Sequence, residues 1–235
     1  MDIKQRIENI NWERAAVDIN HTGYAILPNV LTVAECDAVI NEYDNDALYR
    51  KTVVMERHQY GRGEYKYFSY PLPPLVQQLR ENVYPKLAPV VNGWMKALNK
   101  ETRFPPALAE QLALCHANNQ LKPTALILKY AAGGFNALHQ DLYGELFFPL
   151  QMVIFLNEPG IDYKGGEFVL IEQKPRAQSK AIVLNPHKGD ILVFTTNFRP
   201  VNGVKGYHRV NMKHGVSEIT EGKRHTLGII FHDAG

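Results

Sequence analysis

The sequence predicts a mainly β protein with flanking helices, built around a double-stranded β-helix of the jelly-roll, cupin-like type. Short strand-like runs separated by turn residues dominate from Thr124 to the C-terminus, and about eight of them can be distinguished, as a jelly roll requires. The preceding half instead carries helical periodicity and helix-start signals. A chain of 235 residues, 45% of them hydrophobic, can bury a sizeable core.

One domain is expected over residues 1–235, because no internal repeat, low-complexity segment or second core signal appears. Within it, residues 1–122 are expected to form a support region of helices and strands. Residues 123–235 are expected to form the jelly-roll core.

The support region begins with a charged, mildly amphipathic stretch over residues 2–19, which predicts a helix covering the core. Thr32 and Glu35 form a Thr-x-x-Glu capping box, which predicts a second helix extending to about Tyr43. Residues 52–70 mix aromatic, charged and glycine residues, and this pattern indicates a strand, a glycine-rich turn and another strand.

A long helical stretch is predicted from about residue 71 to residue 98, with apolar residues near helical spacing. Pro85 and Pro89 are expected to kink or split it, because proline removes a backbone hydrogen bond in a helix interior. Another helix is predicted over residues 107–117, following Pro105 and Pro106.

Composition narrows the cellular setting and the partners. The net charge is +2 with acids and bases interspersed. The overall charge therefore does not indicate binding to a nucleic acid or a membrane, although a local patch of basic residues is compatible with it. Cys36 and Cys115 are too few and too far apart for a disulfide framework or a cysteine zinc site. The chain begins with charges and has no apolar run of spanning length. We therefore expect a cytoplasmic protein with no membrane partner.

His139 and Asp141 form a His-x-Asp pair, whose side chains can leave the same face of a strand end. Two imidazoles and one carboxylate make the ligand set of non-haem Fe(II) oxygenases, which leaves coordination positions open for other ligands and oxygen. His214 can supply the third ligand from elsewhere in the fold. A lone His-x-Asp pair is a weak signal, and the alternative is a loop histidine beside a turn or capping aspartate.

Arg224 lies in a strand-like run over residues 223–231 and shares one face of it with Thr226. A guanidinium fork together with a hydroxyl suits the far carboxylate of a dicarboxylic acid. Lys223 and Lys129 are alternative anchors for such a carboxylate.

Several short motifs follow one another in a fixed order along the second half of the chain. They read Tyr130, Gly134, His139-Gln140-Asp141, Leu156-Asn157, Gly165-Gly166-Glu167-Phe168, Gly189-Asp190, His214 and Arg224. In this order the chain resembles the 2-oxoglutarate and Fe(II)-dependent dioxygenases of the prolyl-4-hydroxylase-like branch, from Leu126 to the C-terminus. It is also similar to a bacterial family of uncharacterised 2-oxoglutarate oxygenases that share the stretches 139–144 and 214–217.

The resemblance implies a set of cofactors and residue roles. His139, Asp141 and His214 would bind Fe(II), and Arg224 would bind the distal carboxylate of 2-oxoglutarate. Many prolyl hydroxylases have lysine where Arg224 stands, and either residue can hold a carboxylate. The resemblance also implies O2 as the oxidant and is compatible with ascorbate as a reductant. The other candidates for co-substrate contact are Tyr130, Gln151 and Thr226, of which the first two could equally be packed, hydrogen-bonded core residues.

His208 also precedes Arg224, but the ten-residue spacing of the family favours His214 as the third ligand. His225 is expected on the opposite face of its strand from Arg224, as a packing or surface residue. His232 lies near the end of the same strand. The four histidines not yet named have no carboxylate partner at ligand spacing and are assigned structural or solvent roles. They are His21, His58, His116 and His187.

Substrate contacts are predicted for Arg62 and Tyr65 in the segment 57–67, because aromatic rings stack on flat groups and guanidinium groups hold anions. A twisted hairpin with a solvated face is the alternative for that segment. Arg199, in an expected loop before His214, is a second candidate for the mouth of the site.

Three functions remain open at this level. The first is hydroxylation of an unactivated C–H bond in a protein side chain or amino-acid-like molecule, with conversion of 2-oxoglutarate to succinate and CO2. The second is oxidative demethylation of alkylated nucleic-acid bases, which the near-neutral charge makes less favoured. The third is a metal-binding jelly roll without turnover, a sensor. The oligomeric state does not follow from the sequence.

Overall fold

The computed structural model describes residues 1–141, 144–174 and 176–235. Its helices are α1 (Ile3–Glu8), α2 (Trp12–Thr22), α3 (Val33–Asn41), α4 (Pro74–Ala97) and α5 (Leu108–Ala117), with 3-10 turns η1 (Asp46–Leu48) and η2 (Met55–His58). Its strands are β1 (Tyr24–Leu27), β2 (Tyr49–Val54), β3 (Gly61–Arg62), β4 (Glu64–Phe68), β5 (Leu126–Ala131), β6 (Phe135–His139), β7 (Leu150–Phe155), β8 (Tyr163–Gly165), β9 (Phe168–Gln173), β10 (Lys180–Leu184), β11 (Ile191–Thr195), β12 (Phe198–Gly203), β13 (Gly206–Val216) and β14 (Ile219–Ile230).

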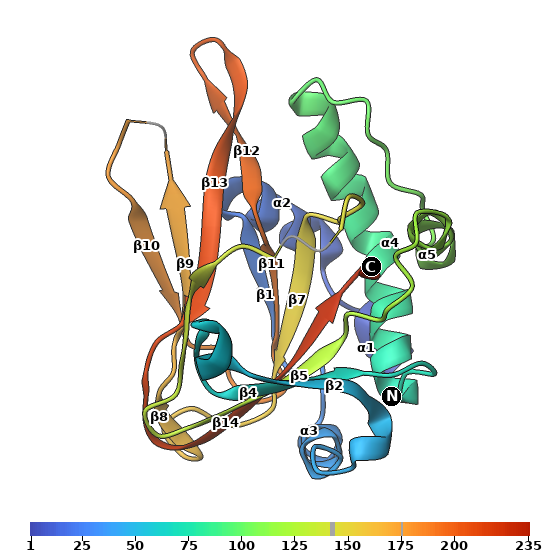
Figure 1. The fold of residues 1–235 in the computed structure, drawn as a ribbon. Helices are drawn as coiled ribbons and strands as arrows, with labels where there is room; N and C mark the ends of the chain where they lie inside the picture. The colour runs from blue at the N-terminus through green and yellow to red at the C-terminus, as the bar shows by residue number, and fades with distance from the viewer. Residues whose placement is uncertain (142–143, 175) are drawn as a thin grey trace.

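Two antiparallel sheets form the core of the molecule (Figure 1). The larger sheet has the strand order β1-β11-β7-β14-β5-β4-β2, with β8 attached to β14. The smaller sheet has the order β10-β9-β13-β6-β3, with β12 attached to β13. This arrangement is the predicted jelly roll, in which strands far apart in sequence become neighbours.

The support region is not separated from the jelly-roll core. β1, β2 and β4 come from residues 1–122, yet they form both outer parts of the larger sheet. β1 pairs with β11 at one edge, while β4 and β2 extend the sheet beyond β5 at the other. The expected division at residue 122 therefore does not coincide with a boundary in the sheet.

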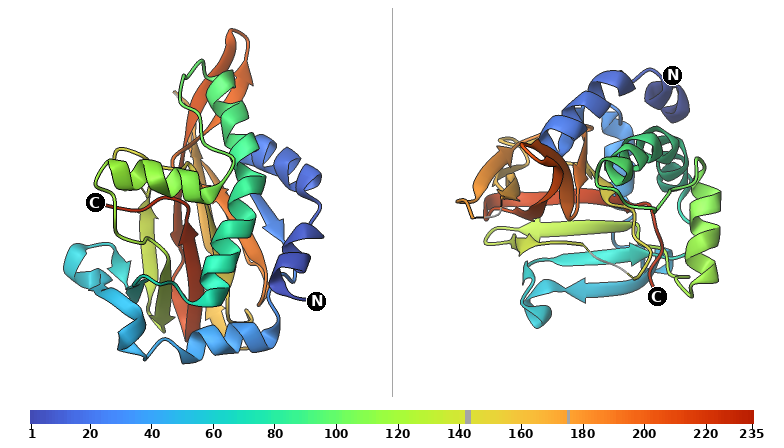
Figure 2. Two further views of the ribbon diagram at one scale, coloured as in Figure 1. Left: turned by 90° about the vertical axis from the view of Figure 1, so that its right-hand side faces the viewer. Right: turned by 90° about the horizontal axis from the view of Figure 1, so that it is seen from above.

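The larger sheet packs against other parts of the molecule on both of its faces, as β7 shows. All six residues of β7 are buried. Met152 and Ile154 belong to a core cluster that includes residues of α4, whereas Val153 and Phe155 pack with residues of the smaller sheet. Side chains of a strand alternate between faces, so a strand buried on both sides reads as a continuous apolar run. The helices accordingly lie on one face of the larger sheet, as Figure 2 shows, and leave its other face to the smaller sheet.

The helix predictions are mostly confirmed. The capping box is present: Glu35 N donates to Thr32 Oγ1 and Thr32 N donates to the Glu35 carboxylate. The helix predicted over residues 107–117 is α5. The strand, turn and strand expected over residues 52–70 are β2 and β4, with η2 and β3 between them.

Two expectations are corrected. The single helix expected over residues 2–19 is two helices, because Asn9 ends α1 and the Asn11 side chain accepts from Arg14 N to begin α2. Pro85 and Pro89 do not split α4, which continues through both of them as one helix of 24 residues. Burial of α4 along the larger sheet compensates for the backbone hydrogen bonds that proline removes.

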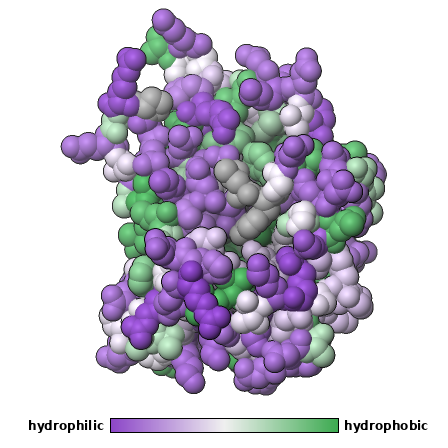
Figure 3. Space-filling view, in the orientation of Figure 1, coloured by the Kyte–Doolittle hydropathy of each residue, from purple (hydrophilic) through white to green (hydrophobic). Residues whose placement is uncertain are grey.

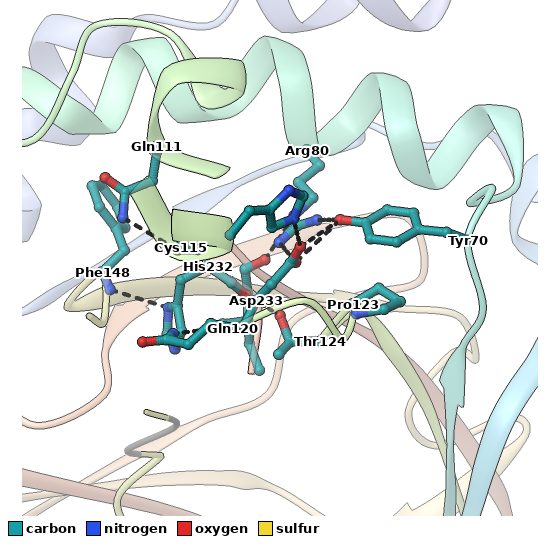
Figure 4. A network of polar contacts seen from close by, with 12 residues as sticks. Tyr70, Arg80, Gln111, Cys115, Gln120, Pro123, Thr124, Phe148, His232 and Asp233 are labelled. Atoms are coloured by element: carbon teal, nitrogen blue, oxygen red, sulfur yellow. Dashed lines mark hydrogen bonds and ion pairs between the residues drawn. The ribbon is translucent and has the colours of Figure 1, made fainter. Parts of the chain in front are cut away.

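A buried polar network fastens α4 and α5 to the end of the larger sheet (Figure 4). Arg80 Nη2 lies 2.8 Å from Asp233 Oδ1, and both side chains are 0% exposed. Arg80 Nε also donates to the Ile230 carbonyl at the end of β14, and the Tyr70 hydroxyl and His116 Nε2 contact the same Asp233 carboxylate. Because removing one partner would leave a buried charge, this network fixes how the helices sit on the sheet.

Among the described residues, no helix combines the length and the apolar composition needed to cross a bilayer.

Candidate active site

A cavity of about 390 Å³ opens between the two sheets. Its walls come from β5, β7 and β14 of the larger sheet and from β6, β9 and β13 of the smaller one. It is lined mainly by apolar and aromatic side chains, with a few polar groups among them. Such a cavity is the usual setting of a small-molecule site, in which the polar groups fix the orientation of the ligand.

Strand pairing brings the predicted metal ligands together. His139 ends β6 and is the register partner of His214 on β13. Asp141 Oδ1 lies 3.5 Å from His139 Nε2, and Asp141 Oδ2 lies 3.3 Å from His214 Nε2. One ligand atom from each of the three residues can be chosen so that all lie within 4.8 Å of one another. The cluster therefore has the composition and spacing of a two-His-one-carboxylate metal site.

Burial and mutual contacts set the charges of this cluster. Burial raises the pKa of Asp141, but hydrogen bonds with His139 and His214 outweigh it and hold that pKa well below its usual range. Burial, with the nearby His139, lowers the pKa of His214. The carboxylate is thus ionised and the His214 imidazole neutral near pH 7, as a divalent metal requires of its ligands. Burial lowers the pKa of His139, but the contact with Asp141 outweighs it and raises that pKa, so a metal would have to displace a proton from His139.

The neighbours of the ligands hold them in orientation. His139 Nδ1 lies 2.7 Å from the Ala137 carbonyl, to which it can donate, so that Nε2 is directed toward Asp141. Gln151 on β7 donates from Nε2 to Asp141 Oδ2 at 2.8 Å. The Gln151 amide oxygen is buried and has no hydrogen-bond partner among the described residues, so it is free to meet a ligand in the cavity.

Gln140, between the two ligands of the His-x-Asp pair, was not recognised from the sequence. Its Nε2 lies 2.8 Å from the Met212 carbonyl and 3.0 Å from both the carbonyl and the side-chain oxygen of Asn197. Met212 is two residues before His214 on β13. Gln140 thereby ties the segment that carries His139 and Asp141 to the strand that carries His214.

Arg224 is buried at 1% exposure in the wall of the same cavity. All three of its side-chain nitrogens lack a hydrogen-bond partner among the described residues. The guanidinium instead faces the rings of Phe155, Tyr130 and Tyr163, with centroid distances of 5.2, 5.7 and 5.9 Å. A buried cation with unused donors is costly unless a ligand supplies the acceptors, so this end of the cavity suits a carboxylate.

Gly166 makes room for that arginine. Its φ is +67°, and a Cβ placed there would lie 2.3 Å from Ile219 Cδ1 and 3.1 Å from Arg224 Cδ. Glycine is therefore required both by the backbone conformation and by the close passage of the Arg224 side chain. This explains, in this fold, one glycine of the Gly-Gly-Glu motif.

Tyr130 and Thr226, the candidates for co-substrate contact, line the cavity beside Arg224. Tyr130 on β5 is the register partner of Arg224 on β14, and Thr226 lies two residues further along β14. Burial raises the pKa of Tyr130 to about 12, so its hydroxyl stays protonated and can donate. The donor set of this region fits the two ends of 2-oxoglutarate, with the metal ligands at one side and Arg224 at the other.

The alternatives considered for these roles lie elsewhere. His208 is exposed in the β12–β13 pair, opposite Val201. Lys129 Nζ sits over the Tyr43 ring, 4.6 Å from its centroid, and neither Lys129 nor Lys223 lines the cavity. His225 is buried and is 3.1 Å from the Asn157 side-chain oxygen, which agrees with the packing role expected of it.

Of the predicted substrate contacts, only Tyr65 lines the cavity. The Arg62 side chain is 63% exposed, lies 4.0 Å from Glu56 and does not reach the cavity wall. Arg199 was expected in a loop at the mouth, but it lies on β12 and is 9% exposed. Its guanidinium is held by Glu172 at 2.5 Å, and this buried ion pair keeps it away from the cavity.

The structure adds cavity residues that were not recognised from the sequence. Tyr60 and Leu138 line the cavity and are 51% and 48% exposed, so they form its rim. Tyr163 supplies one of the rings around Arg224. An aromatic residue shortly before the Gly-Gly-Glu motif was a visible signal for Tyr163, whereas nothing local distinguishes Tyr60 from the other aromatics of its segment.

A family model called Oxygenase-NA matches residues 63–234 of the chain. Its description is "Oxygenase, catalysing oxidative methylation of damaged DNA". The chain belongs to the Oxygenase-NA family. The match contains all three candidate metal ligands and Arg224.

Relatives of this Oxygenase-NA protein include an uncharacterised protein, Rv2227, of Mycobacterium tuberculosis strain H37Rv. The two are 48% identical over 167 residues, which are 71% of this chain and 72% of the relative. A protein of Mycobacterium tuberculosis strain CDC 1551, MT2286, matches to the same extent and is also described as uncharacterised.

Solved structures share the fold at low sequence identity. A Pseudomonas putida prolyl-4-hydroxylase matches 95% of this chain and 100% of its own, with a TM-score of 0.56 and 14% identity. SnoN, a non-haem α-ketoglutarate-dependent epimerase from nogalamycin biosynthesis, matches 92% of this chain and 80% of its own, with a TM-score of 0.55 and 14% identity. The solved structures therefore confirm that the chain has the fold of the predicted 2-oxoglutarate and Fe(II) oxygenases.

Proposed function

We propose that this Oxygenase-NA protein hydroxylates a C–H bond of its substrate while converting 2-oxoglutarate and O2 to succinate and CO2. One oxygen atom of O2 would enter the substrate and the other would enter succinate. The observation that carries the proposal is Arg224, a buried cation whose three side-chain nitrogens have no hydrogen-bond partner among the described residues, in the same cavity as the His139, Asp141 and His214 cluster. A cluster that only stored a metal would have no need of that cation, which argues against a sensor without turnover.

The chain's own residues would divide the work between binding and exclusion of water. When bound, Fe(II) supplies the oxidising chemistry that no side chain provides. Arg224 would hold the distal carboxylate of 2-oxoglutarate, with the Tyr130 hydroxyl as a further donor. Gln151 would keep Asp141 in its liganding orientation through the 2.8 Å hydrogen bond. Phe168 and Phe194 pack on His214 and keep water from that side of the ligand.

For the substrate we propose an N-methylated base of damaged nucleic acid, the second of the classes named from the sequence. The family description supports damaged DNA. Fe(II), 2-oxoglutarate and O2 include no methyl donor, so the reaction compatible with them is removal of a methyl group. Hydroxylation of an N-methyl carbon gives an N-hydroxymethyl group, whose C–N bond breaks to release formaldehyde and restore the N–H.

The rim of the cavity supports a flat substrate. The exposed Tyr60 ring stacks on His58 with 5.3 Å between centroids and 23° between planes, and Tyr65 lies on the cavity wall. Aromatic side chains of this kind stack on unpaired bases regardless of sequence. A protein side chain or amino-acid-like molecule, which the motif order favours, would undergo the same hydroxylation and is the competing substrate class.

The deciding experiment measures succinate and formaldehyde from the Fe(II)-loaded protein in air. Single-stranded oligonucleotides carrying N-methylated adenine or cytosine are compared with unmodified oligonucleotides and with proline-containing peptides. We expect formaldehyde in proportion to succinate only with the methylated bases. Succinate stimulated by a peptide, without formaldehyde, would instead favour the protein hydroxylase, and Asp141→Ala is the inactive control.

A further inference from the structure

Two β-hairpins of the smaller sheet concentrate the positive charge of the molecule. The β9–β10 hairpin (residues 168–184) and the β12–β13 hairpin (residues 198–216) together contain seven Lys or Arg and one acidic residue, Glu172. Their formal charge is +6, whereas the whole chain carries +2. The rest of the chain is therefore net acidic, and the near-neutral total conceals a strongly basic region.

Both hairpins project from the sandwich in the same direction (Figure 1). The first half of β13, up to Val210, pairs with β12 and not with β9, whereas residues 211–216 pair with β9. The outer part of the β12–β13 hairpin thus extends beyond the sheet. Hydrophilic side chains cover this upper end of the molecule in Figure 3, so its charges are presented to solvent.

Most of these cations have no acidic partner. Glu172 engages Arg199 at 2.5 Å and Lys174 at 3.5 Å. The other exposed cations form no ion pair with any residue that the structure describes. They are Arg176, Lys180, Lys205 and Arg209. Unpaired cations on one projecting end create a local field that attracts a polyanion, even on a chain of low net charge.

We propose that these two hairpins, which we call the basic hairpins, bind the phosphate backbone of the nucleic acid whose base enters the cavity. This inference rests on the nucleic-acid substrate proposed above. A phosphate group is bound by the ammonium group of a lysine or by the guanidinium fork of an arginine, and the basic hairpins contain both kinds of residue. Tyr207, 54% exposed on β13, adds a ring on which a base can stack.

β13 connects the basic hairpins with the active site. It carries Arg209 five residues before His214, a separation of about 17 Å along an extended strand. A strand of nucleic acid can span that distance with a few nucleotides while one base reaches the cavity. An acidic protein or an anionic membrane would be attracted by the same charges, but neither would make use of this continuity with the cavity.

The test is binding of an unmodified 20-nucleotide single strand, measured by fluorescence anisotropy between 0.05 and 0.3 M salt. The substituted protein carries Arg176→Gln, Lys180→Gln and Lys205→Gln, none of which touches the cavity. The matched control carries Lys4→Gln, Lys86→Gln and Lys164→Gln, which remove the same charge outside the basic hairpins. Each lost phosphate contact lowers the salt slope of log K by about 0.7 for a single strand.

We expect the hairpin triple variant to lose about 2 from the slope and about a hundredfold in affinity at 0.1 M salt, while the control changes affinity less than threefold. Equal losses in both triple variants would overturn the proposal. Binding of a poly-glutamate peptide or of anionic phosphatidylglycerol vesicles to the wild type as tightly as DNA would also overturn it. The probe in this binding test carries no methylated base. A failure to observe demethylation would therefore refute the proposed reaction but would leave the binding of DNA by the basic hairpins to be decided by the anisotropy measurement.

Discussion

Replacement of Arg224 by methionine separates co-substrate binding from folding. In the wild type the guanidinium is buried and has no protein hydrogen-bond partner among the described residues. Removing it therefore deletes a cation whose desolvation is offset only by its contacts with three aromatic rings, and the free protein should be as stable as the wild type or more stable. The cost of leaving a buried donor unsatisfied is about 1 to 3 kcal/mol, which is the scale of the expected gain.

The same substitution should remove most of the 2-oxoglutarate affinity. Truncating one partner of a buried, hydrogen-bonded charge pair costs about 2 to 5 kcal/mol, which corresponds to roughly 30-fold to several thousandfold in Kd. Arg224→Lys is the matched control, because it keeps the charge but loses the fork, and it should fall between wild type and methionine.

Thermal unfolding with and without 2-oxoglutarate, in the presence of Mn(II) in place of Fe(II), measures both effects. Ligand at 100 times Kd stabilises the wild type by about 2.7 kcal/mol, or about 5 to 10 °C in Tm for a chain of this length. The methionine variant should be stabilised by about 0.9 kcal/mol at most at that concentration, or about 3 °C or less in Tm. A full shift in the variant, or titration calorimetry giving a Kd within threefold of wild type, would refute the assignment of Arg224.

Three further predictions concern the other polar residues of the structure. His214→Ala should abolish Fe(II) binding in an anaerobic titration whereas His208→Ala should leave it intact, and the reverse pattern would exchange their roles. Gln151→Leu should weaken metal binding by about 10- to 100-fold, with Gln151→Glu as the control of similar size; an unchanged affinity would show that Asp141 is held without it. Burial, with Lys129 and Lys223, lowers the pKa of His225 to about 4, so the unfolded chain takes up a proton below about pH 6.5 that the folded chain refuses down to pH 4. The free energy of unfolding should therefore fall by about 3 kcal/mol as the pH decreases across that window. Urea unfolding at several pH values should show a weaker pH dependence of this free energy for His225→Gln than for the wild type. The same pH dependence in both proteins would show that His225 is not the cause.

The sequence predicted the parts of the site that depend on residue type and strand register. His139, Asp141 and Arg224 were singled out because metal and carboxylate chemistry restricts the choice of side chain, and all three line the same cavity. The alternation of side chains along a strand correctly placed Thr226 beside Arg224 on one face of β14.

What the sequence did not predict depends on contacts between distant segments. Arg199 looked like a loop residue, but its role is set by Glu172, 27 residues away on a neighbouring part of the sheet. Gln140 looked like a spacer between two ligands, although its amide joins two other segments. Pro85 and Pro89 are tolerated in α4 because packing on the larger sheet outweighs their local cost. In each case a contact with a residue far away in the sequence determines the structure, and no local sequence pattern specifies that contact.

The contribution of β1, β2 and β4 to the larger sheet bears on how this fold can be divided. The family match begins at residue 63, after β1 and β2. A chain shortened to that match would expose the hydrogen-bonding edges of β11 and β4, which now pair with β1 and β2. Bare strand edges invite pairing with other molecules. The shortened chain should therefore aggregate. In the full chain, the segment before residue 63 covers these strand edges and so prevents self-association of the oxygenase.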